Sequence, residues 1–162
     1  AVGDCNGQLM LAHAASEQGM IAAENCMGAD VTFDASLCPS GVYSSPELAG
    51  VGLTEKQARE QGIACRTAAF PAAANGRSLI LQQESGVVKV VVGEQYGELL
   101  GVHICGAQAT ELIAEAALAL KLEATAEELA GTIHPHPTLS ECLREAALAA
   151  MDRAVHISGR KR

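Results

Sequence analysis

Two histidines separated by one proline give this chain its clearest chemical signature. They lie in the segment Thr132–Glu141, which reads TIHPHPTLSE. A proline fixes its own φ and pushes the residue before it toward extended backbone. The two prolines therefore hold His134 and His136 on a stiff segment, called the strap from here on (residues 132–140). An imidazole on such a support can accept or donate a proton near neutral pH.

A carboxylate follows at a position from which it could orient one of these rings. Glu141 comes five residues after His136, in the first turn of a predicted helix, where a negative charge is favoured. By accepting a hydrogen bond from one ring nitrogen, it would leave the other nitrogen free for proton transfer. His136 and Glu141 are therefore the candidate catalytic residues. The alternative is that Thr138 and Glu141 form a capping box, in which Glu141 serves only the backbone.

The two histidines are not sufficient for a metal site. Zinc sites take three or four protein ligands at characteristic spacings. No third ligand accompanies His134 and His136 at a suitable distance along the chain. No metal is therefore predicted.

The elements that must position the strap follow from hydrophobic periodicity and turn residues. Helices are expected over residues 7–27, 55–61, 108–122 and 138–152, and a further short helix after a capping box that begins at Thr125. Strands are expected over 63–68, 78–83, 87–92 and 99–104, with a hairpin turn at 84–86. A loop and unit boundary is expected near residues 39–46, which are rich in proline, glycine and serine. This order predicts an α+β fold, in which helices flank an antiparallel sheet of about four to five strands.

Composition and charge exclude several classes of protein. The chain has 162 residues, enough for one domain or for one domain with part of another. Its net charge of −8 argues against a nucleic-acid partner. No apolar run is long enough to cross a membrane, and no signal sequence is recognised, so a cytoplasmic location is expected. The six cysteines show no C-x-x-C spacing and are interpreted as mostly buried free thiols.

The strap and its surroundings resemble a known family. The segment HPTLSE at residues 136–141, with a second histidine two places earlier, is similar to the C-terminal signature of the dihydrolipoamide dehydrogenases within the pyridine nucleotide-disulfide oxidoreductases. Further similar segments occur in the family's order across nearly the whole chain. They are AVGD at 1–4, MLAH at 10–13, VYSSPE at 42–47, VGLTE at 51–55 and ATELI at 109–113.

The resemblance implies an activity and roles for particular residues. The full-length enzyme would be a homodimer that oxidises dihydrolipoamide to lipoamide with FAD and NAD, the dihydrolipoamide being carried by the lipoyl domain of a 2-oxoacid dehydrogenase complex. His136 would act as the base in the partner subunit's active site, and Glu141 would position it. The flavin cofactor would be touched by Asp4 at its ribityl chain and by the backbone of residues 10–13. Those residues are Met10, Leu11, Ala12 and His13.

The resemblance also divides the chain into parts. Residues 1–37 would be the C-terminal remnant of an FAD-binding domain, residues 38–155 the dimerisation domain, and residues 156–162 a flexible tail. The family's G-x-G-x-x-G fingerprints and its C-x-x-x-x-C disulfide do not occur here and would lie upstream. The chain alone is therefore expected to be inactive and to hold FAD weakly or not at all.

Two alternatives stay open at this point. The chain could be a non-catalytic dimerisation module in which His136 is vestigial, or the same domain of a related disulfide reductase. Glutathione and mercuric reductases also carry a His-Pro-Thr segment near their C-termini. Asp4, without the resemblance, would be interpreted as a polar residue that caps a turn.

Overall fold

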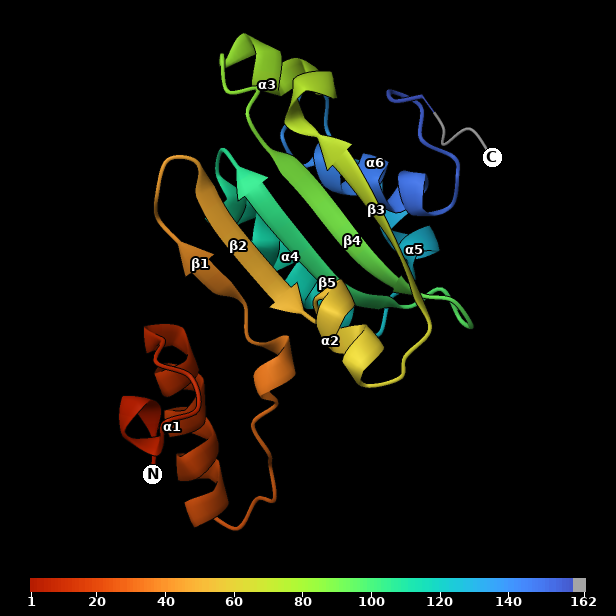
Figure 1. Cartoon of the computed structure of the whole chain (residues 1–162). Coiled ribbons are helices and arrows are strands. Elements are labelled where there is room, and N and C mark those ends of the chain that lie inside the picture. Colours follow the sequence, from red (N-terminus) through yellow and green to blue (C-terminus); the bar gives the residue numbers. More distant parts are fainter. Residues whose placement is uncertain (159–162) are drawn as a thin grey trace. The chain divides into compact units, whose positions relative to one another are not determined.

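A computed structural model describes residues 1–158 of the chain. The chain divides into two compact units, Ala1–Cys38 and a larger unit that begins at Pro39 (Figure 1). The expected tail lies partly outside the described residues, since residues 159–162 are not included. The assignment of the units to an FAD-binding remnant and a dimerisation domain stays a proposal.

The first unit is a helix with a short turn packed on it. The turn η1 (Gly3–Asn6) is followed by α1 (Ala12–Cys26) and by the turn η2 (Ala35–Leu37). The buried side chain of Gln18 fastens η1 to α1, because its Oε1 atom accepts hydrogen bonds from Gly3 N and Asn6 Nδ2, each at 2.8 Å. The helix expected from residue 7 starts only at Ala12, because Gly7 takes a left-handed conformation and ends η1.

The second unit is built on a five-stranded antiparallel sheet. Its strands are β1 (Ser40–Val42), β2 (Glu47–Gly52), β3 (Cys65–Pro71), β4 (Val87–Gly93) and β5 (Leu99–Gly106). The strand order is β1-β2-β5-β4-β3, and every neighbouring pair is antiparallel. The predicted α+β class is confirmed.

Several of the sequence predictions for this unit are wrong. Residues 78–83, expected to form a strand, lie in the helix α3 (Gly76–Ile80) and the turn after it. Asn75 explains the difference, because its Oδ1 atom accepts from Ser78 N at 2.9 Å and thereby caps a helix. The hairpin expected at residues 84–86 is accordingly absent. In contrast, β1 lies in the region expected to be loop, and β2, which follows it, was not predicted. β1 pairs with β2, and β2 pairs with distant β5.

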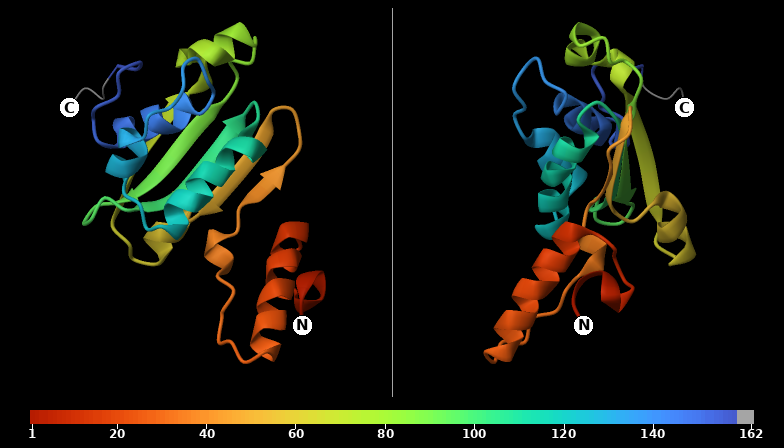
Figure 2. Two further views of the ribbon diagram at one scale, coloured as in Figure 1. Left: turned by 180° about the vertical axis from the view of Figure 1, so that it is seen from behind. Right: turned by 90° about the vertical axis from the view of Figure 1, so that its left-hand side faces the viewer.

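The helices α4 (Ala109–Lys121), α5 (Ala126–Gly131) and α6 (Glu141–Ala150) lie on one side of the sheet (Figure 2). α4 packs on β2 and β5, α6 packs on β3 and β4, and α5 packs on α6. The sequence predicted that this helix begins at Thr138, but α6 begins at Glu141. The core between these layers is aliphatic, and several of its side chains have no exposed surface. They include Val90, Val92, Val102, Leu143, Ala146 and Ala147.

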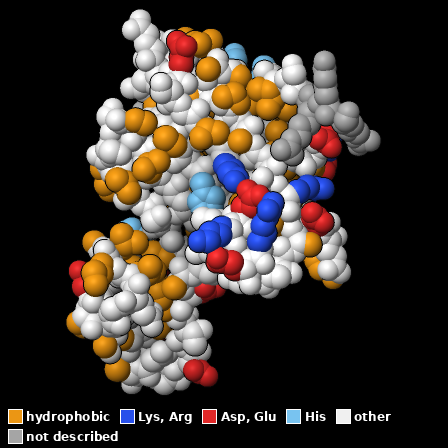
Figure 3. Space-filling view, in the orientation of Figure 1, with side chains coloured by type: hydrophobic (Ala, Val, Ile, Leu, Met, Phe, Trp, Pro, Cys, Tyr) orange, Lys and Arg blue, Asp and Glu red, His pale blue; other side chains and the backbone are white. Residues whose placement is uncertain are grey.

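Within the second unit, the other side of the sheet carries exposed apolar side chains. Val42, Leu48 and Val87 point away from the helices and are 53%, 45% and 38% exposed. Hydrophobic side chains gather on this face, next to a charged group at one end of it (Figure 3). In that group Glu55, in α2 (Glu55–Glu60), lies 2.7 Å from Lys89 Nζ and is also paired with Arg59. None of the helices in residues 1–158 has the length and apolar character needed to cross a membrane.

Candidate active site

The structure brings the two candidate catalytic residues together. His136 Nδ1 lies 2.9 Å from Glu141 Oε1. The imidazole is 77% exposed, while the Glu141 side chain is 22% exposed. The ring is thus held at one nitrogen by a half-buried carboxylate, and most of its surface is exposed.

Glu141 uses its second oxygen to hold the strap itself. Glu141 Oε2 accepts from the backbone N–H of Thr138 at 2.8 Å. The Thr138 hydroxyl does not complete a capping box, because it donates to the Pro135 carbonyl at 2.7 Å. The residue preceding α6 is Ser140, which makes no side-chain capping bond. The expected capping box at Thr138 is therefore wrong in its threonine half, and Glu141 serves both the backbone and His136.

The environment of Glu141 keeps it ionised. Burial by itself raises the pKa of this carboxyl group. The hydrogen bonds from Thr138 and His136, with the charges of His136 and His156, outweigh that effect and lower the pKa below its ordinary value. A carboxylate only accepts hydrogen bonds, so the Nδ1 atom of His136 must carry the proton between them. This tautomer leaves a lone pair on Nε2, which is the atom a general base needs.

Two further residues hold the strap, and the sequence analysis missed both. Asn75 Nδ2 donates to the Thr138 carbonyl at 3.0 Å, across 63 positions of the chain. Glu115, on α4, lies 2.7 Å from His134 Nε2. The only sequence signals were an asparagine before Gly76 and a glutamate standing off the apolar face of its helix.

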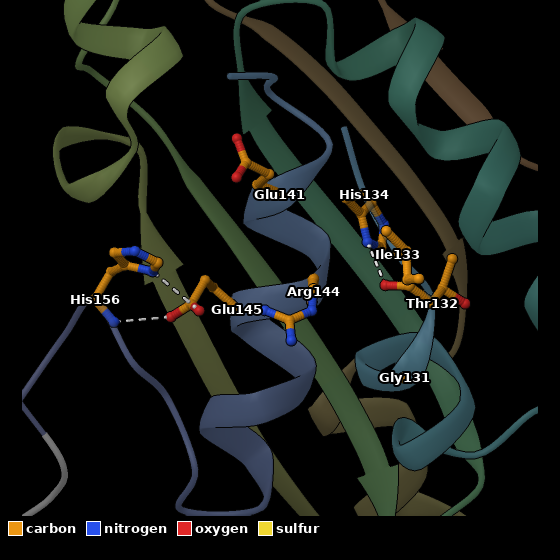
Figure 4. A pocket seen from close by; sticks show the side chains of 8 residues that line it. All are labelled: Gly131, Thr132, Ile133, His134, Glu141, Arg144, Glu145 and His156. Carbon is orange, nitrogen blue, oxygen red and sulfur yellow. Dashed lines mark hydrogen bonds and ion pairs between the residues drawn. The ribbon is translucent and has the colours of Figure 1, made fainter. Parts of the chain in front are cut away.

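A small pocket of about 160 Å³ lies beside the strap and α6 (Figure 4). Glu145, which is 3% exposed, accepts backbone N–H bonds from Val155 and His156 at 3.1 Å and thereby holds the segment after α6. The remaining lining residues are Gly131, Thr132, Ile133, His134, Glu141 and Arg144. Within residues 1–158, no three histidine, cysteine or acidic side chains are grouped so that they could hold a metal ion.

The residues predicted to touch FAD lie in the first unit. Asp4 is exposed within η1, and Met10 is 72% exposed. Leu11 precedes α1 without a side-chain capping bond, and Ala12 and His13 form the first turn of that helix. An uncapped helix start presents backbone N–H groups to an acceptor, and an exposed carboxylate can accept from hydroxyl groups. These features fit the last edge of a flavin site.

Comparison with known proteins identifies the class of domain. Residues 38–147 match the dimerisation domain of the pyridine nucleotide-disulphide oxidoreductases. The chain belongs to this family.

Several dihydrolipoyl dehydrogenases are similar to the chain in sequence. The protein of that name from Thermus scotoductus is 50% identical over 160 residues, which cover 99% of this chain and 34% of the relative. The one from Bacillus subtilis is 46% identical over 157 residues, which cover 96% of this chain and 33% of the relative. The chain thus spans about a third of the length of these relatives.

Two solved structures have a similar fold over most of this chain. LpdA from Mycobacterium tuberculosis matches with a TM-score of 0.86 and 33% identity, over 91% of this chain and 32% of that one. The HOCl-induced flavoprotein disulfide reductase RclA from Escherichia coli matches with a TM-score of 0.81 and 26% identity, over 91% of this chain and 34% of that one.

Proposed function

We propose that this chain is the dimerisation segment of a dihydrolipoyl dehydrogenase, which oxidises dihydrolipoamide to lipoamide with FAD and NAD. The observation that carries this proposal is the His136 imidazole, fixed at Nδ1 by an ionised carboxylate and exposed at its other side. The names of the sequence relatives support the substrate.

The proposed reaction needs a base beside the thiol groups of dihydrolipoamide. A thiolate, not a thiol, attacks a disulfide. His136 Nε2 would take the proton from one thiol of dihydrolipoamide, and Glu141 would stabilise the imidazolium that results. The thiolate then attacks a disulfide of the enzyme, so that a mixed disulfide forms and an enzyme thiolate leaves. Attack by the second thiol of the substrate closes lipoamide and leaves the enzyme dithiol. FAD, when bound, would accept the two electrons for transfer to NAD.

The first unit would contribute a small part of the flavin site. The Asp4 carboxylate would accept hydrogen bonds from the ribityl hydroxyls, and the backbone N–H groups at the start of α1 would face the flavin ring. Because this is one edge of a larger site, the chain alone would hold FAD weakly or not at all.

The proposal also concerns the oligomeric state, the source of the substrate and the cellular location. The full-length protein would be a homodimer in which His136 serves the neighbouring subunit, and its substrate would be carried by a lipoyl domain of a 2-oxoacid dehydrogenase complex. The cytoplasmic location stays a prediction, since relatives from Caenorhabditis elegans and Pisum sativum are named mitochondrial.

The test is the substitution His136→Gln in the full-length enzyme. Loss of a general base should lower the turnover of dihydrolipoamide by roughly 10²- to 10⁴-fold. His103→Gln is the matched control, because His103 lies in β5 and its ring contacts the Leu53 carbonyl at 3.1 Å. A rate for His136→Gln close to that of the wild type would remove the catalytic assignment.

A related disulfide reductase is the second candidate, favoured by the structural match to RclA. Assays of the full-length protein with lipoamide, oxidised glutathione and mercuric ion distinguish the two candidates. Preference for lipoamide supports the main proposal. Absence of turnover with all three would favour a dimerisation module without catalysis.

A further inference from the structure

The second histidine of the strap is held more tightly than the candidate base. The His134 side chain is 4% exposed. Its Nε2 atom lies 2.7 Å from Glu115 Oε1, and its Nδ1 atom lies 3.0 Å from the Thr132 carbonyl oxygen. Both ring nitrogens are therefore occupied by groups of the chain itself, so His134 is not available for proton transfer with a ligand.

The two contacts of His134 require the pair to hold an additional proton. A carbonyl oxygen only accepts, so His134 Nδ1 must donate to Thr132. An ionised carboxylate also only accepts, so the Nε2 contact needs a second proton, located either on the ring or on Glu115. Hydrogen bonds with a charged partner are shorter and stronger than neutral ones, in agreement with the 2.7 Å separation.

Glu115 connects the strap to a rigid part of the domain. It lies in the middle of α4, between Ile113 and Ala116, which are 4% and 0% exposed. α4 packs on the central strands of the sheet. A hydrogen bond to Glu115 therefore fixes His134 relative to the core, and not only to its neighbours in sequence.

The strap has a second anchor on its other side. The Thr138 carbonyl accepts from Asn75, which is 5% exposed, and the Thr138 N–H is held by Glu141. Only residues 135–137 lie between the anchors at His134 and Thr138, and His136 is the middle one. Glu141 orients the exposed His136 ring directly, and the position of the His136 backbone depends on these anchors.

We propose that His134 and Glu115 are positioning residues, which hold the strap so that His136 points toward its substrate. This inference rests on the proposed role of His136 as a base. Neither residue would touch the reacting atoms. Misplacing a catalytic group by about 1 Å can cost on the order of 10²-fold in rate, so loss of the anchor should reduce turnover without removing the base.

The first experiment measures the order of the strap in the 162-residue chain, whatever its activity. Backbone ¹⁵N relaxation of His136 and Thr138 is compared in the wild type, Glu115→Ala, Glu115→Gln and Glu111→Ala. Glutamine can still pair with His134, and Glu111 is an exposed residue one turn earlier on the same helix. We expect increased fast motion at His136 in Glu115→Ala alone. Equal order in all four chains would overturn the proposal.

The second experiment uses the full-length enzyme and a double-mutant cycle. Glu115→Ala should lower kcat for dihydrolipoamide roughly 10- to 100-fold, with an unchanged KM for NAD. In the His136→Gln background, the same substitution should cause no further loss, because an anchor acting through His136 has nothing left to position. Glu115→Gln should recover most of the rate, and Glu111→Ala should retain it. If Glu115→Ala does not fold, Glu115→Asp gives the same comparison with a shortened carboxylate.

The outcomes separate this inference from the proposed function. An equal fold-loss from Glu115→Ala in both backgrounds would show a general structural effect and would overturn the positioning role. A near wild-type rate for His136→Gln would instead remove the proposed function, and the relaxation comparison would then decide by itself whether Glu115 orders the strap.

Discussion

At the scale of single residues, the Glu141 carboxylate makes two contacts that have different roles. One of its oxygens orients the His136 ring, and the other holds the backbone of the strap at Thr138. Its place at the first position of α6 explains how both are possible, since the helix fixes the carboxylate directly beneath the strap. The orientation of the His136 ring and the position of the strap therefore both depend on the Glu141 carboxylate.

This coupling predicts how stability depends on pH. The pKa of Glu141 is lower in the folded chain than its ordinary value of 4.5. Its contribution to stability is therefore fully present above about pH 4.5 and is lost as the pH falls through the lower, folded value. Glu141→Gln should be less stable than the wild type at pH 7, and the difference should shrink below pH 4.5. Urea unfolding of both chains from pH 7 to pH 3 measures this, and a constant difference would contradict it.

The cysteines give a second prediction at this scale. The expectation that most of them are buried is wrong, because Cys142 alone among the six is buried while Cys5 and Cys26 are exposed. Burial, followed by the charges of Glu141 and Glu145, raises the pKa of the Cys142 thiol to about 12. Because the thiolate is the reactive form, iodoacetamide at pH 8 should label Cys5 and Cys26 and spare Cys142 until the chain is unfolded. Peptide mass spectrometry reads this out, and early labelling of Cys142 would be the contrary result.

At the scale of elements, the sheet depends on a close approach between β5 and the segment after β2. A Cβ atom added at Gly101 would lie 2.1 Å from the Leu53 carbonyl oxygen. The backbone at Leu53 would have to move, although its N–H bonds Leu100 O at 2.7 Å. Gly101→Ala should therefore destabilise the chain by about 1 to 3 kcal/mol or more. Gly76→Ala, with no atom within 4 Å, is the control and should be close to neutral in thermal unfolding.

Helix starts and contacts that depend only on neighbouring residues were predictable from the sequence. The expected capping box at Thr125 is present, and the helix expected over residues 55–61 also begins after a capping box, at Thr54. The pairing of His136 with Glu141 also spans only five residues, so its geometry could be anticipated. Each of these contacts is set by the few residues that make it.

Elements whose stability comes from distant partners were not predictable. β2 is rich in glycine and alanine and is a strand because it pairs with the distant strand β5. The apolar run at residues 79–81 favours a strand, yet Leu79 and Ile80 are 49% and 61% exposed and lie in a helix that Asn75 caps. For the same reason, no spacing rule connects Asn75 to Thr138 or Glu115 to His134.

At the scale of the whole molecule, the exposure of His136 matters most. A base that is 77% exposed in its own chain is solvated by water, whereas proton transfer to a thiol is favoured in a site from which water is excluded. A second subunit would supply the missing wall of the site. In sedimentation, the full-length protein should therefore behave as a two-fold dimer, and a strict monomer at high concentration would contradict this expectation.

A subunit-mixing experiment tests the exchange of residues between subunits. Full-length His136→Gln subunits are combined with subunits that keep His136 but lack the redox disulfide expected upstream, and each variant alone should be inactive. A hybrid dimer has one site with an intact disulfide from one subunit and an intact His136 from the other. Random pairing of equal amounts makes half of the dimers hybrid with half of their sites complete, so about a quarter of the wild-type activity should return. If His136 acted within its own subunit, no site of any dimer would be complete, and mixing would restore nothing.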